Sequence, residues 1–600
     1  MQNWDMILAQ FTRKVKDLNP LQDREFDQLI FQFASSTVDA HVSYRNNSNY
    51  SRELPFQMTY TRPDGGEGVY HINWVAEGFP SNVRKPKPLD QVLAIENLSV
   101  EQYRNQFDAY KSDGKDEVDR SLFAQRIVSM SEAGGMPLQD MNPNGLRLKL
   151  KDKDSGDVYE ILVPYTEKGT PMISRNTTPL ILKESKDLNK PTVQIERNID
   201  KKNKRDGGGL KDGERPFRES KLFKQNDRGE GRRVALGDKN TLFELPKDAV
   251  EITFPMNETI RQLEERMRNA DPLNQDPLNR NELKAYVFNK EVNGKTMRVG
   301  FLRIPSYSPS NVDTIIYRLR HVMAEMNQRS DMLVIDQMNN PGGAVSYSNA
   351  VIRNLVPQIK KENLMEFLVR PTRSWVQRYS DTISRFENNL AVIRLLGDQK
   401  YNALLADLKL NNERIIKAYQ AENGFSISEG VVLHSLNEAM QIISDATLIG
   451  SNNLLYGALM STGLGSVFLK DQPYNAEKPV YFLINEKDFS GGDATPADFQ
   501  DQQRGKIVGI GATHTAGAGG TVESFEIPGY GRISITASLM HRPAQAAAGN
   551  HKYAFVEKVG ISADHTIWYT AQDQVSGFKT VYDKLFEYIG KDLQAKTPNP

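Results

Sequence analysis

A serine followed by two glycines is the first feature of this sequence that could carry chemistry. Ser490 stands between the apolar segment 480–484 and a predicted helix, with Gly491 and Gly492 directly after it. A serine at a sharp bend between a strand and a helix is exposed as a nucleophile, and the amino end of the helix stabilises negative charge that develops beside it. A serine in this position more commonly caps the helix. The pattern alone therefore leaves two roles for Ser490, nucleophile and N-cap.

A second glycine-rich turn follows another predicted strand. The apolar segment 331–336 leads into the run 339–343, which reads Asn-Asn-Pro-Gly-Gly. A pair of glycines allows positive φ angles and leaves backbone N–H groups free to bind an oxyanion, although a plain tight turn is the alternative. In open α/β sheets, catalytic groups collect at the carboxyl ends of the strands. Both turns are expected at that edge.

The residue types present exclude several kinds of chemistry. The eight histidines form no HxxxH or HxH group, so the sequence predicts no metal site and no cofactor, and spacing does not select a general base among them. The glycine-rich loop 513–520 has no lysine and no Walker spacing, which excludes a phosphate-binding loop. The chain has no cysteine, which excludes a thiol nucleophile and a disulfide framework.

The composition is that of an ordinary soluble globular protein. The 600 residues include 76 basic and 76 acidic side chains, so the formal net charge is zero. A neutral chain has no overall field that attracts nucleic acid or anionic lipid, and this length predicts several domains of about 100–200 residues each. No signal-peptide pattern is found at the chain start. The uncharged run Ala446–Leu469 is too polar to span a membrane and is predicted to be buried strand and loop.

The second half of the chain alternates strands and helices, which is typical of an α/β fold with parallel strands. A charged helical block at 386–424 interrupts the alternation and is predicted to lie outside the sheet. Strands are predicted at 297–304, 331–336, 480–484 and 506–509, and helices at 312–328, 348–359, 496–503 and 576–595.

The first half is organised differently. Segment 55–165 is β-rich, with two predicted hairpins, and a helix predicted at 120–130 completes a compact domain. The basic, glycine-rich segment Arg197–Arg233 has too few large apolar residues to form a core, and it is predicted to be a solvated linker. A nucleic-acid-binding patch and a protease-accessible connector are the alternatives for it.

Four of these segments, in this order, resemble the tail-specific, or C-terminal processing, serine proteases. They are 299–308, Ile335–Gly343, Leu483–Ser490 and Thr515–Gly520, and the resemblance extends with varying strength from about Phe11 to the C-terminal helix. It implies a crotonase-like βαβ protease core in an α/β fold, with an inserted β-rich, PDZ-like domain and a helical insertion.

The resemblance also implies a catalytic triad. Ser490 stands at the nucleophile position of the family. One branch pairs this serine with a lysine in the loop that Thr513–Gly520 matches, but the loop has no lysine here. A second branch has a Ser–His–Glu arrangement, which His41 and Glu557 match, and His514 is the reserve candidate for the base.

The oxyanion hole that the resemblance implies is built from backbone N–H groups of the two glycine turns. Gly342, Gly343 and Gly491 are the expected donors, and neither a metal nor a cofactor is implied. In this arrangement His41 takes the proton of Ser490, and Glu557 orients the imidazole.

The wider expectations concern domains and biology. The chain is expected to be a secreted or periplasmic bacterial serine endopeptidase that acts on protein or peptide substrates as a homodimer, with no nucleic-acid partner and no membrane span. It is expected to be a zymogen activated by self-cleavage in the connector. A catalytically silent peptide-binding module on the same fold and a scaffold are the alternatives, and no clear Gly-Leu-Gly-Phe carboxylate-binding loop is found in the PDZ-like domain.

The expected divisions are 1–54, a helical part of the catalytic domain that carries His41; 55–170, the PDZ-like domain; 190–245, the connector; and 246–600, the protease core with a helical insertion at about 360–425.

Overall fold

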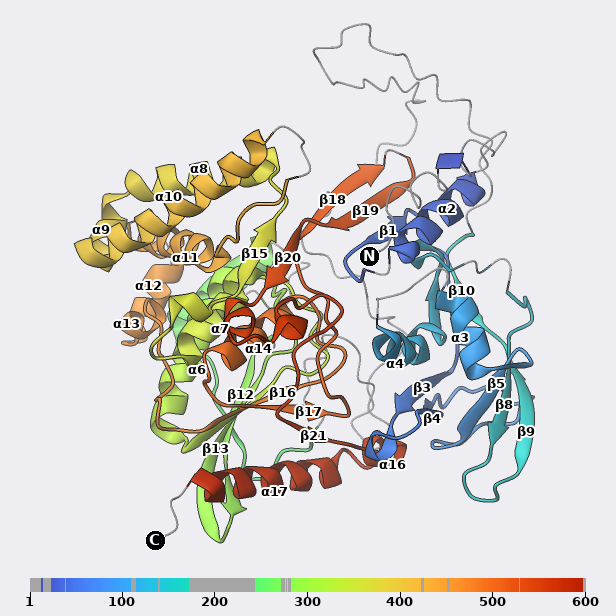
Figure 1. Ribbon diagram of the computed structural model, residues 1–600. Coiled ribbons are helices and arrows are strands. Elements are labelled where there is room, and N and C mark those ends of the chain that lie inside the picture. Colours follow the sequence, from blue (N-terminus) through green and yellow to red (C-terminus); the bar gives the residue numbers. More distant parts are fainter. Residues whose placement is uncertain are drawn as a thin grey trace, which may run out of the picture.

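The computed structural model has a mixed α/β architecture in which a β-rich part and a larger α/β part lie side by side (Figure 1). All but the last three residues of the connector predicted at 190–245, including Arg197–Arg233, lie outside the described residues. The structure describes residues 23–37, 39–108, 115–136, 141–171, 243–270, 282–421, 426–450, 454–527 and 529–596, together with residues 12, 13, 138, 276 and 278.

A seven-stranded sheet forms the centre of the α/β part. The strand order is β11-β12-β13-β14-β16-β17-β21, and each neighbouring pair from β13 to β21 is parallel, which confirms the parallel strands predicted from the sequence. Its elements are β11 (Val250–Glu251), β12 (Lys284–Val292), β13 (Lys295–Arg303), α6 (Val312–Arg329), β14 (Met332–Asp336), α7 (Val345–Leu355), β16 (Val480–Ile484), α14 (Gly491–Asp501), β17 (Lys506–Ile510), β21 (His565–Ile567) and α17 (Lys579–Lys596).

Alternate side chains of the parallel strands enter two separate apolar cores. Leu333 and Ile335 of β14 pack in the core to which α6, α7 and α14 contribute. Met332 and Val334 pack in the core to which α17 contributes on the opposite face. Because both faces are covered, β14 and β16 are completely buried, which explains why their sequences are apolar without alternation.

A helical insertion extends from the α/β part, on the side away from the β-rich part (Figure 1). The charged block predicted at 386–424 is helical, as expected, and the insertion begins before it. The helices are α8 (Arg373–Glu387), α9 (Leu390–Leu396) and α10 (Asp398–Gln420), and they pack with α11 (Leu433–Gly450).

The prediction that Ala446–Leu469 forms strand and loop is wrong. The run contains the end of α11, then α12 (Leu454–Met460) and α13 (Gly465–Phe468). Leu448, Leu459 and Phe468 are buried in a core shared with α5 (Glu258–Ala270) and α6. The many small and polar residues of the run have no strong preference of their own, so packing against these helices decides its structure. Among the described residues, no helix combines the length and the apolar character that a membrane crossing requires.

The β-rich part is an antiparallel sheet with its own apolar core. The strand order is β3-β4-β5-β8-β9, and the two predicted hairpins are confirmed as β3–β4 and β8–β9. The helix predicted at 120–130 is α4, which begins and ends four residues earlier. The elements are β3 (Phe56–Thr61), β4 (Val69–Val75), β5 (Gln91–Ile95), β6 (Leu98–Ser99), α3 (Val100–Asp108), α4 (Asp116–Arg126), β8 (Leu146–Lys151) and β9 (Val158–Val163).

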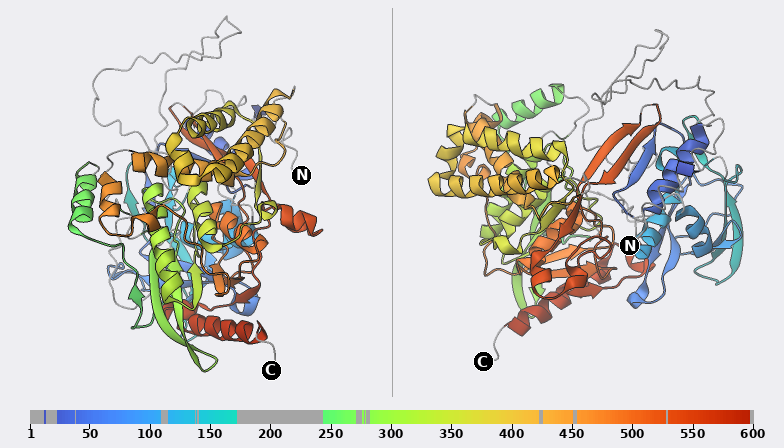
Figure 2. Two further views of the ribbon diagram at one scale, coloured as in Figure 1. Left: turned by 90° about the vertical axis from the view of Figure 1, so that its left-hand side faces the viewer. Right: turned by 45° about the horizontal axis from the view of Figure 1, so that its top comes forward.

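Three small sheets complete the fold. In one of them, β1 pairs with β19, so that a strand from the first fifty residues lies beside a strand from the last seventy (blue and orange-red in the right-hand view of Figure 2). The remaining elements are α2 (Asp23–Ser36), β1 (Ser43–Asn46), β2 (Ser51–Glu53), β7 (Ser129–Ser131), β10 (Thr166–Lys168), β15 (Glu366–Val369), β18 (Val522–Ile527), β19 (Gly531–Thr536), β20 (Ser538–His541), α15 (Pro543–Ala547) and α16 (Ala571–Val575).

Candidate active site

Ser490 lies at a strained bend between β16 and α14. Its φ of 54° and ψ of −108° are unusual for a residue with a side chain. Ser490 occupies the N-cap position of α14, but its hydroxyl makes no capping hydrogen bond, so the N-cap role that the sequence left open is not used. Its N–H donates to the carbonyl oxygen of Ala518 at 3.0 Å. The bend therefore fixes the backbone and leaves a half-buried hydroxyl without a hydrogen-bond partner among the described residues.

The two turns singled out in the sequence lie against each other at the carboxyl edge of the sheet. Strands β14 and β16 are parallel neighbours, with Asp336 beside Leu483. Beyond the strand ends, the N–H of Asn340 donates to Oδ1 of the buried Asp488 at 2.9 Å, and the N–H of Phe489 donates to the carbonyl oxygen of Asn340 at 2.9 Å. These bonds hold the Asn-Asn-Pro-Gly-Gly turn directly beside the serine bend.

Two backbone N–H groups are positioned to bind an oxyanion next to Ser490. Gly342 and Gly343 have φ angles of 85° and 143°, which favour glycine. The N–H of Gly342 donates to Asn340 Oδ1 at 2.9 Å and is therefore not available to an oxyanion. Of the three oxyanion donors expected from the sequence, Gly343 and Gly491 remain. Gly343 and Gly491 have N–H groups with no acceptor among the described residues, and a Cβ placed on Gly491 would lie 3.4 Å from the backbone nitrogen of Gly343.

His41 reaches the α/β part because β1 anchors its segment. Strand β1 pairs antiparallel with β19, with Ser43 beside Ser534. Two residues before His41, Asp39 accepts the N–H of His41 on Oδ1 at 2.9 Å and the hydroxyl of Thr536 on Oδ2 at 2.7 Å. Asp39 therefore fixes the backbone of His41 and ties it to the end of β19.

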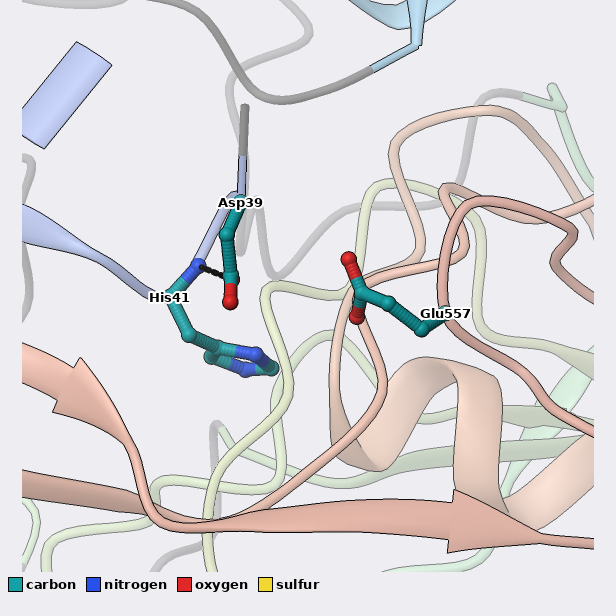
Figure 3. A group of neighbouring side chains, drawn as sticks. All are labelled: Asp39, His41 and Glu557. Atoms are coloured by element: carbon teal, nitrogen blue, oxygen red, sulfur yellow. Dashed lines mark hydrogen bonds between the residues drawn. The ribbon is translucent and has the colours of Figure 1, made fainter. Parts of the chain in front are cut away.

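Glu557 lies next to His41, and its carboxylate points toward the imidazole and toward Asp39 (Figure 3). A ring nitrogen of His41 and a carboxylate oxygen from each of the two acids all lie within 4.8 Å of one another. The structure thus brings together two of the three predicted triad residues, which are more than 500 positions apart in the sequence. One imidazole and two carboxylates at this spacing could also hold a metal ion, although the sequence predicted no metal ligands.

One peptide unit connects Glu557 to the nucleophile. The carbonyl oxygen of Ala518 accepts the N–H of Ser490, and the N–H of the next residue, Gly519, donates to Glu557 Oε2 at 3.0 Å. Burial, and after it the negative charge of Asp39, raises the pKa of Glu557 to about 8. The described side chains of Ser490 and His41 do not form a hydrogen bond with each other. The three residues are therefore linked through the loop 513–520 and the Glu557 carboxylate.

Asp493 holds the loop beside the serine bend, and the sequence patterns did not reveal it. It lies in the first turn of α14 and is fully buried. Its carboxylate accepts the hydroxyl of Thr515 and the N–H groups of Gly517 and Ala518, the last two at 2.9 and 3.1 Å. Burial raises the pKa of Asp493 to about 6. An acidic residue in the first turn after a candidate nucleophile is the sequence signal that could have identified it.

His514, the reserve candidate for the base, belongs to a different cluster. Its Nδ1 lies 2.9 Å from Nζ of Lys115, and its Nε2 lies 3.6 Å from a carboxylate oxygen of Glu117. Burial, followed by the positive charge of Lys115, lowers the pKa of His514. His514 is thus held by residues of the β-rich part, and it makes no hydrogen bond to the described hydroxyl of Ser490.

Comparison with known families gives a match within the α/β part. Residues 298–565 match the model of Peptidase family S41. The matched range contains Ser490, Glu557 and both glycine turns, and it does not contain His41.

Curated relatives occur in Chlamydia. A protein of Chlamydia trachomatis serovar D is 27% identical over 326 residues, which are 51% of this chain and 47% of that relative. An uncharacterized protein of Chlamydia muridarum is 28% identical over 325 residues, with coverages of 51% and 47%. The chain therefore spans about half the length of the curated relatives it matches.

Solved structures share the fold over nearly the whole chain. Mature CPAF complexed with lactacystin has a TM-score of 0.63 at 19% identity, and the match covers 98% of this chain and 92% of CPAF. A crystal structure of mature CPAF gives the same TM-score at 18% identity, with coverages of 99% and 93%. At these identities the likeness establishes a common fold.

Proposed function

Starting from the peptidase family S41 domain that residues 298–565 form, we propose that this chain is a serine endopeptidase. Ser490 is the nucleophile, His41 is the general base, and Glu557 orients His41. The observation that carries the proposal is the bend at Ser490. There a strained serine begins α14 beside the N–H groups of Gly343 and Gly491, and neither its hydroxyl nor these two groups have a hydrogen-bond partner within the described part of the chain.

The proposed reaction proceeds by acyl transfer. The Ser490 hydroxyl attacks the carbonyl carbon of the scissile peptide bond while His41 takes its proton. The carbonyl oxygen becomes an oxyanion, which the N–H groups of Gly343 and Gly491 bind, at roughly 3–4 kcal/mol for each donor. His41 then gives the proton to the leaving amine as the carbon–nitrogen bond breaks. Water, deprotonated by His41, hydrolyses the acyl-enzyme and restores Ser490.

Glu557 supports this chemistry only when it is ionised. Its pKa of about 8 arises from burial and from Asp39, so the free enzyme holds much of this group protonated at neutral pH. When His41 becomes positively charged in the transition state, the adjacent carboxylate gains an opposite charge, which favours its ionised form. We therefore expect kcat/KM to rise with pH toward about 8.

A fluorophosphonate probe tests the nucleophile directly. We expect the wild-type protein to be labelled, Ser490→Ala not to be labelled, and His41→Ala to be labelled slowly. Ser374→Ala is the matched control, because Ser374 also lies near the amino end of a helix, α8, and its replacement should not affect labelling. A wild-type protein that hydrolyses no peptide and takes up no probe would contradict the proposal.

Maturation by self-cleavage extends this proposal. The predicted connector at 190–245 is basic and glycine-rich, and the solved structures of the same fold are described as mature CPAF. We propose cleavage within this connector by the protein itself, a homodimeric active form, and a secreted or periplasmic location. If the wild-type protein and Ser490→Ala both remain one band of full length after purification, the self-cleavage proposal is wrong.

The architecture supports a crotonase-like assignment for the S41 domain and a PDZ-like assignment for the β-rich part. A silent peptide-binding module is the second candidate function, and two observations favour it. The loop Thr513–Gly520 contains no lysine, and Ser490 and His41 share no hydrogen bond. The probe separates the two functions, because a binding module would take up no label in either the wild type or the variants.

A further inference from the structure

A lysine of the β-rich part is inserted between the two loops that support the candidate active site. Lys115 directly precedes α4, and its Nζ lies 3.2 Å from the carbonyl oxygen of Thr515 and 3.0 Å from that of Val559. Thr515 belongs to the loop that contacts both Ser490 and Glu557, and Val559 follows Glu557 by two residues. Lys115 thus joins the β-rich part to both loops.

The same lysine does not serve as the missing general base of a Ser–Lys pair, because its amine makes no hydrogen bond to the described hydroxyl of Ser490. A lysine ammonium has three N–H donors and no acceptor. Its third donor points to Nδ1 of His514 at 2.9 Å, so all three donors have acceptors. The Nδ1 of His514 also lies 3.2 Å from the carbonyl oxygen of Thr515, and its Nε2 faces the Glu117 carboxylate. Lys115 is therefore a bridging group, and its geometry indicates positioning.

Helix α4 also contacts the turn that carries the nucleophile. Val118 and Leu122, on one face of α4, pack with Ala516 and with Phe489, the residue before Ser490. On the same helix, the Ser121 hydroxyl donates to Oε1 of Glu486 at 2.6 Å, in a fully buried contact. Figure 1 shows α4 on the side of the β-rich part that faces the α/β part. One helix thus contacts the serine turn and the loop 513–520 together.

We propose that Lys115 is a positioning residue, and that the docking of α4 sets the geometry of Ser490 and Glu557. The reactivity of the serine then depends on how the β-rich part sits against the S41 domain. The inference rests on the proposed function. It goes beyond the triad because it makes a residue outside the S41 match part of the catalytic support.

Removing the hydrogen-bond donors of Lys115 should change kcat more than KM. Lys115→Met keeps most of the aliphatic stem but leaves the carbonyl oxygens of Thr515 and Val559 and the Nδ1 of His514 without their donor. Because small displacements of catalytic groups reduce rates steeply, we expect kcat to fall by about 10- to 100-fold. We expect KM to change less than twofold. Lys115→Arg keeps the charge and the N–H donors and should recover part of the rate.

The pH profile supplies a readout that a merely structural role would not change. Burial lowers the pKa of Lys115 to about 8, and the groups that face it are His514, Glu117 and Asp493. As Lys115 loses its proton above this pH, one of its three donors and its charge opposite the two carboxylates are lost. Wild-type kcat should therefore decline above about pH 8, and Lys115→Met should lack this decline.

The control variant is Lys87→Met, which removes an exposed lysine of the same part whose ion pairs are with Asp152 and Asp154. It should match the wild type in kcat and pH profile. Far-UV circular dichroism verifies folding, and Ser121→Ala, which breaks the buried contact to Glu486, supplies a second test should Lys115→Met fail to fold. That variant should also lower kcat.

The outcomes separate the inference from the proposed function. A wild type that is labelled by fluorophosphonate, together with a Lys115→Met or Ser121→Ala variant of unchanged kcat and pH profile, overturns the inference alone. Equal losses in Lys115→Arg and Lys115→Met would assign the effect to packing and would also overturn it. A wild type without label or activity would refute the proposed function, whatever these variants do.

Discussion

Replacing Glu557 by glutamine is predicted to stabilise the fold while it reduces activity. Burial and the charge of Asp39 raise the pKa of Glu557 from 4.5 to about 8. In the unfolded chain the same carboxyl ionises at its ordinary value, so unfolding releases a proton between these two pH values. When the pKa of a group is higher in the folded state than in the unfolded chain, the group stabilises the fold fully at pH values below its pKa in the unfolded chain. This stabilisation is lost as the pH rises through the pKa of the folded state. The wild type therefore becomes less stable from about pH 4.5 to 8.

The magnitude follows from the two pKa values. At about 1.4 kcal/mol for each pH unit, the ionisable carboxyl costs about 3 kcal/mol at pH 7, about 4 kcal/mol at pH 8 and about 5 kcal/mol at pH 9 and above. Glutamine has nearly the size of the protonated carboxyl, does not ionise, and can still accept the N–H of Gly519 through its amide oxygen. Glu557→Gln should therefore exceed the wild type in free energy of unfolding by about these amounts, and should equal it near pH 4.

Urea denaturation at pH 4, 7 and 9 measures this difference. Both proteins should carry Ser490→Ala, which prevents self-digestion during the measurement. Glu526→Gln is the matched control, because the Glu526 side chain is 70% exposed and its replacement should not change the unfolding midpoint. In protein that retains Ser490, the Glu557→Gln substitution should remove most of the kcat. A stability difference that is the same at all three pH values, or a wild type that is the more stable protein at pH 9, would refute the electrostatic account of Glu557.

Three further substitutions test the neighbouring contacts. Gly343→Ala places a Cβ 2.2 Å from a backbone carbon at a φ of 143°, so kcat should fall by about 10²–10³ in steady-state assays. Asp39→Asn removes a charge that raises the pKa of Glu557, so the ascending limb of kcat/KM should move to lower pH; an unmoved limb would contradict the assignment. Thr515→Val removes a donor from Asp493 and should lower the urea midpoint by an amount equivalent to about 1–3 kcal/mol.

The central sheet could be predicted from the sequence because its signals are local. Strands β14 and β16 are continuous apolar runs that end in glycine-rich turns, and both turns were found at the expected edge. The run Ala446–Leu469 could not be assigned in this way, because its contacts with α5 and α6 select its helices. The use of the Gly342 N–H by the Asn340 side chain is likewise a three-dimensional detail that spacing does not reveal.

The position of His41 shows a different limit. No periodicity relates residue 41 to residue 557, and only the resemblance to a family suggested that they act together. In the structure, the pairing of β1 with β19 and the bond from Thr536 to Asp39 bring them together. These are long-range contacts between residues 39–46 and β19, so the candidate general base could be named from the resemblance but its placement could not be derived.

The groups proposed to act in catalysis are held by contacts of different kinds, and this has a consequence for how the proposed activity is controlled. Ser490, Gly343 and Gly491 are fixed by neighbouring strands within the α/β part, and Glu557 is tied to them through the loop that Asp493 holds. His41 and Lys115 both come from outside residues 298–565, one on a strand that pairs with β19 and the other on the β-rich part. In the proposed arrangement, the α/β part supplies the nucleophile and the oxyanion-binding N–H groups, and the N-terminal segments supply the base and the loop support. We therefore expect activity to depend on docking of these segments against the α/β part.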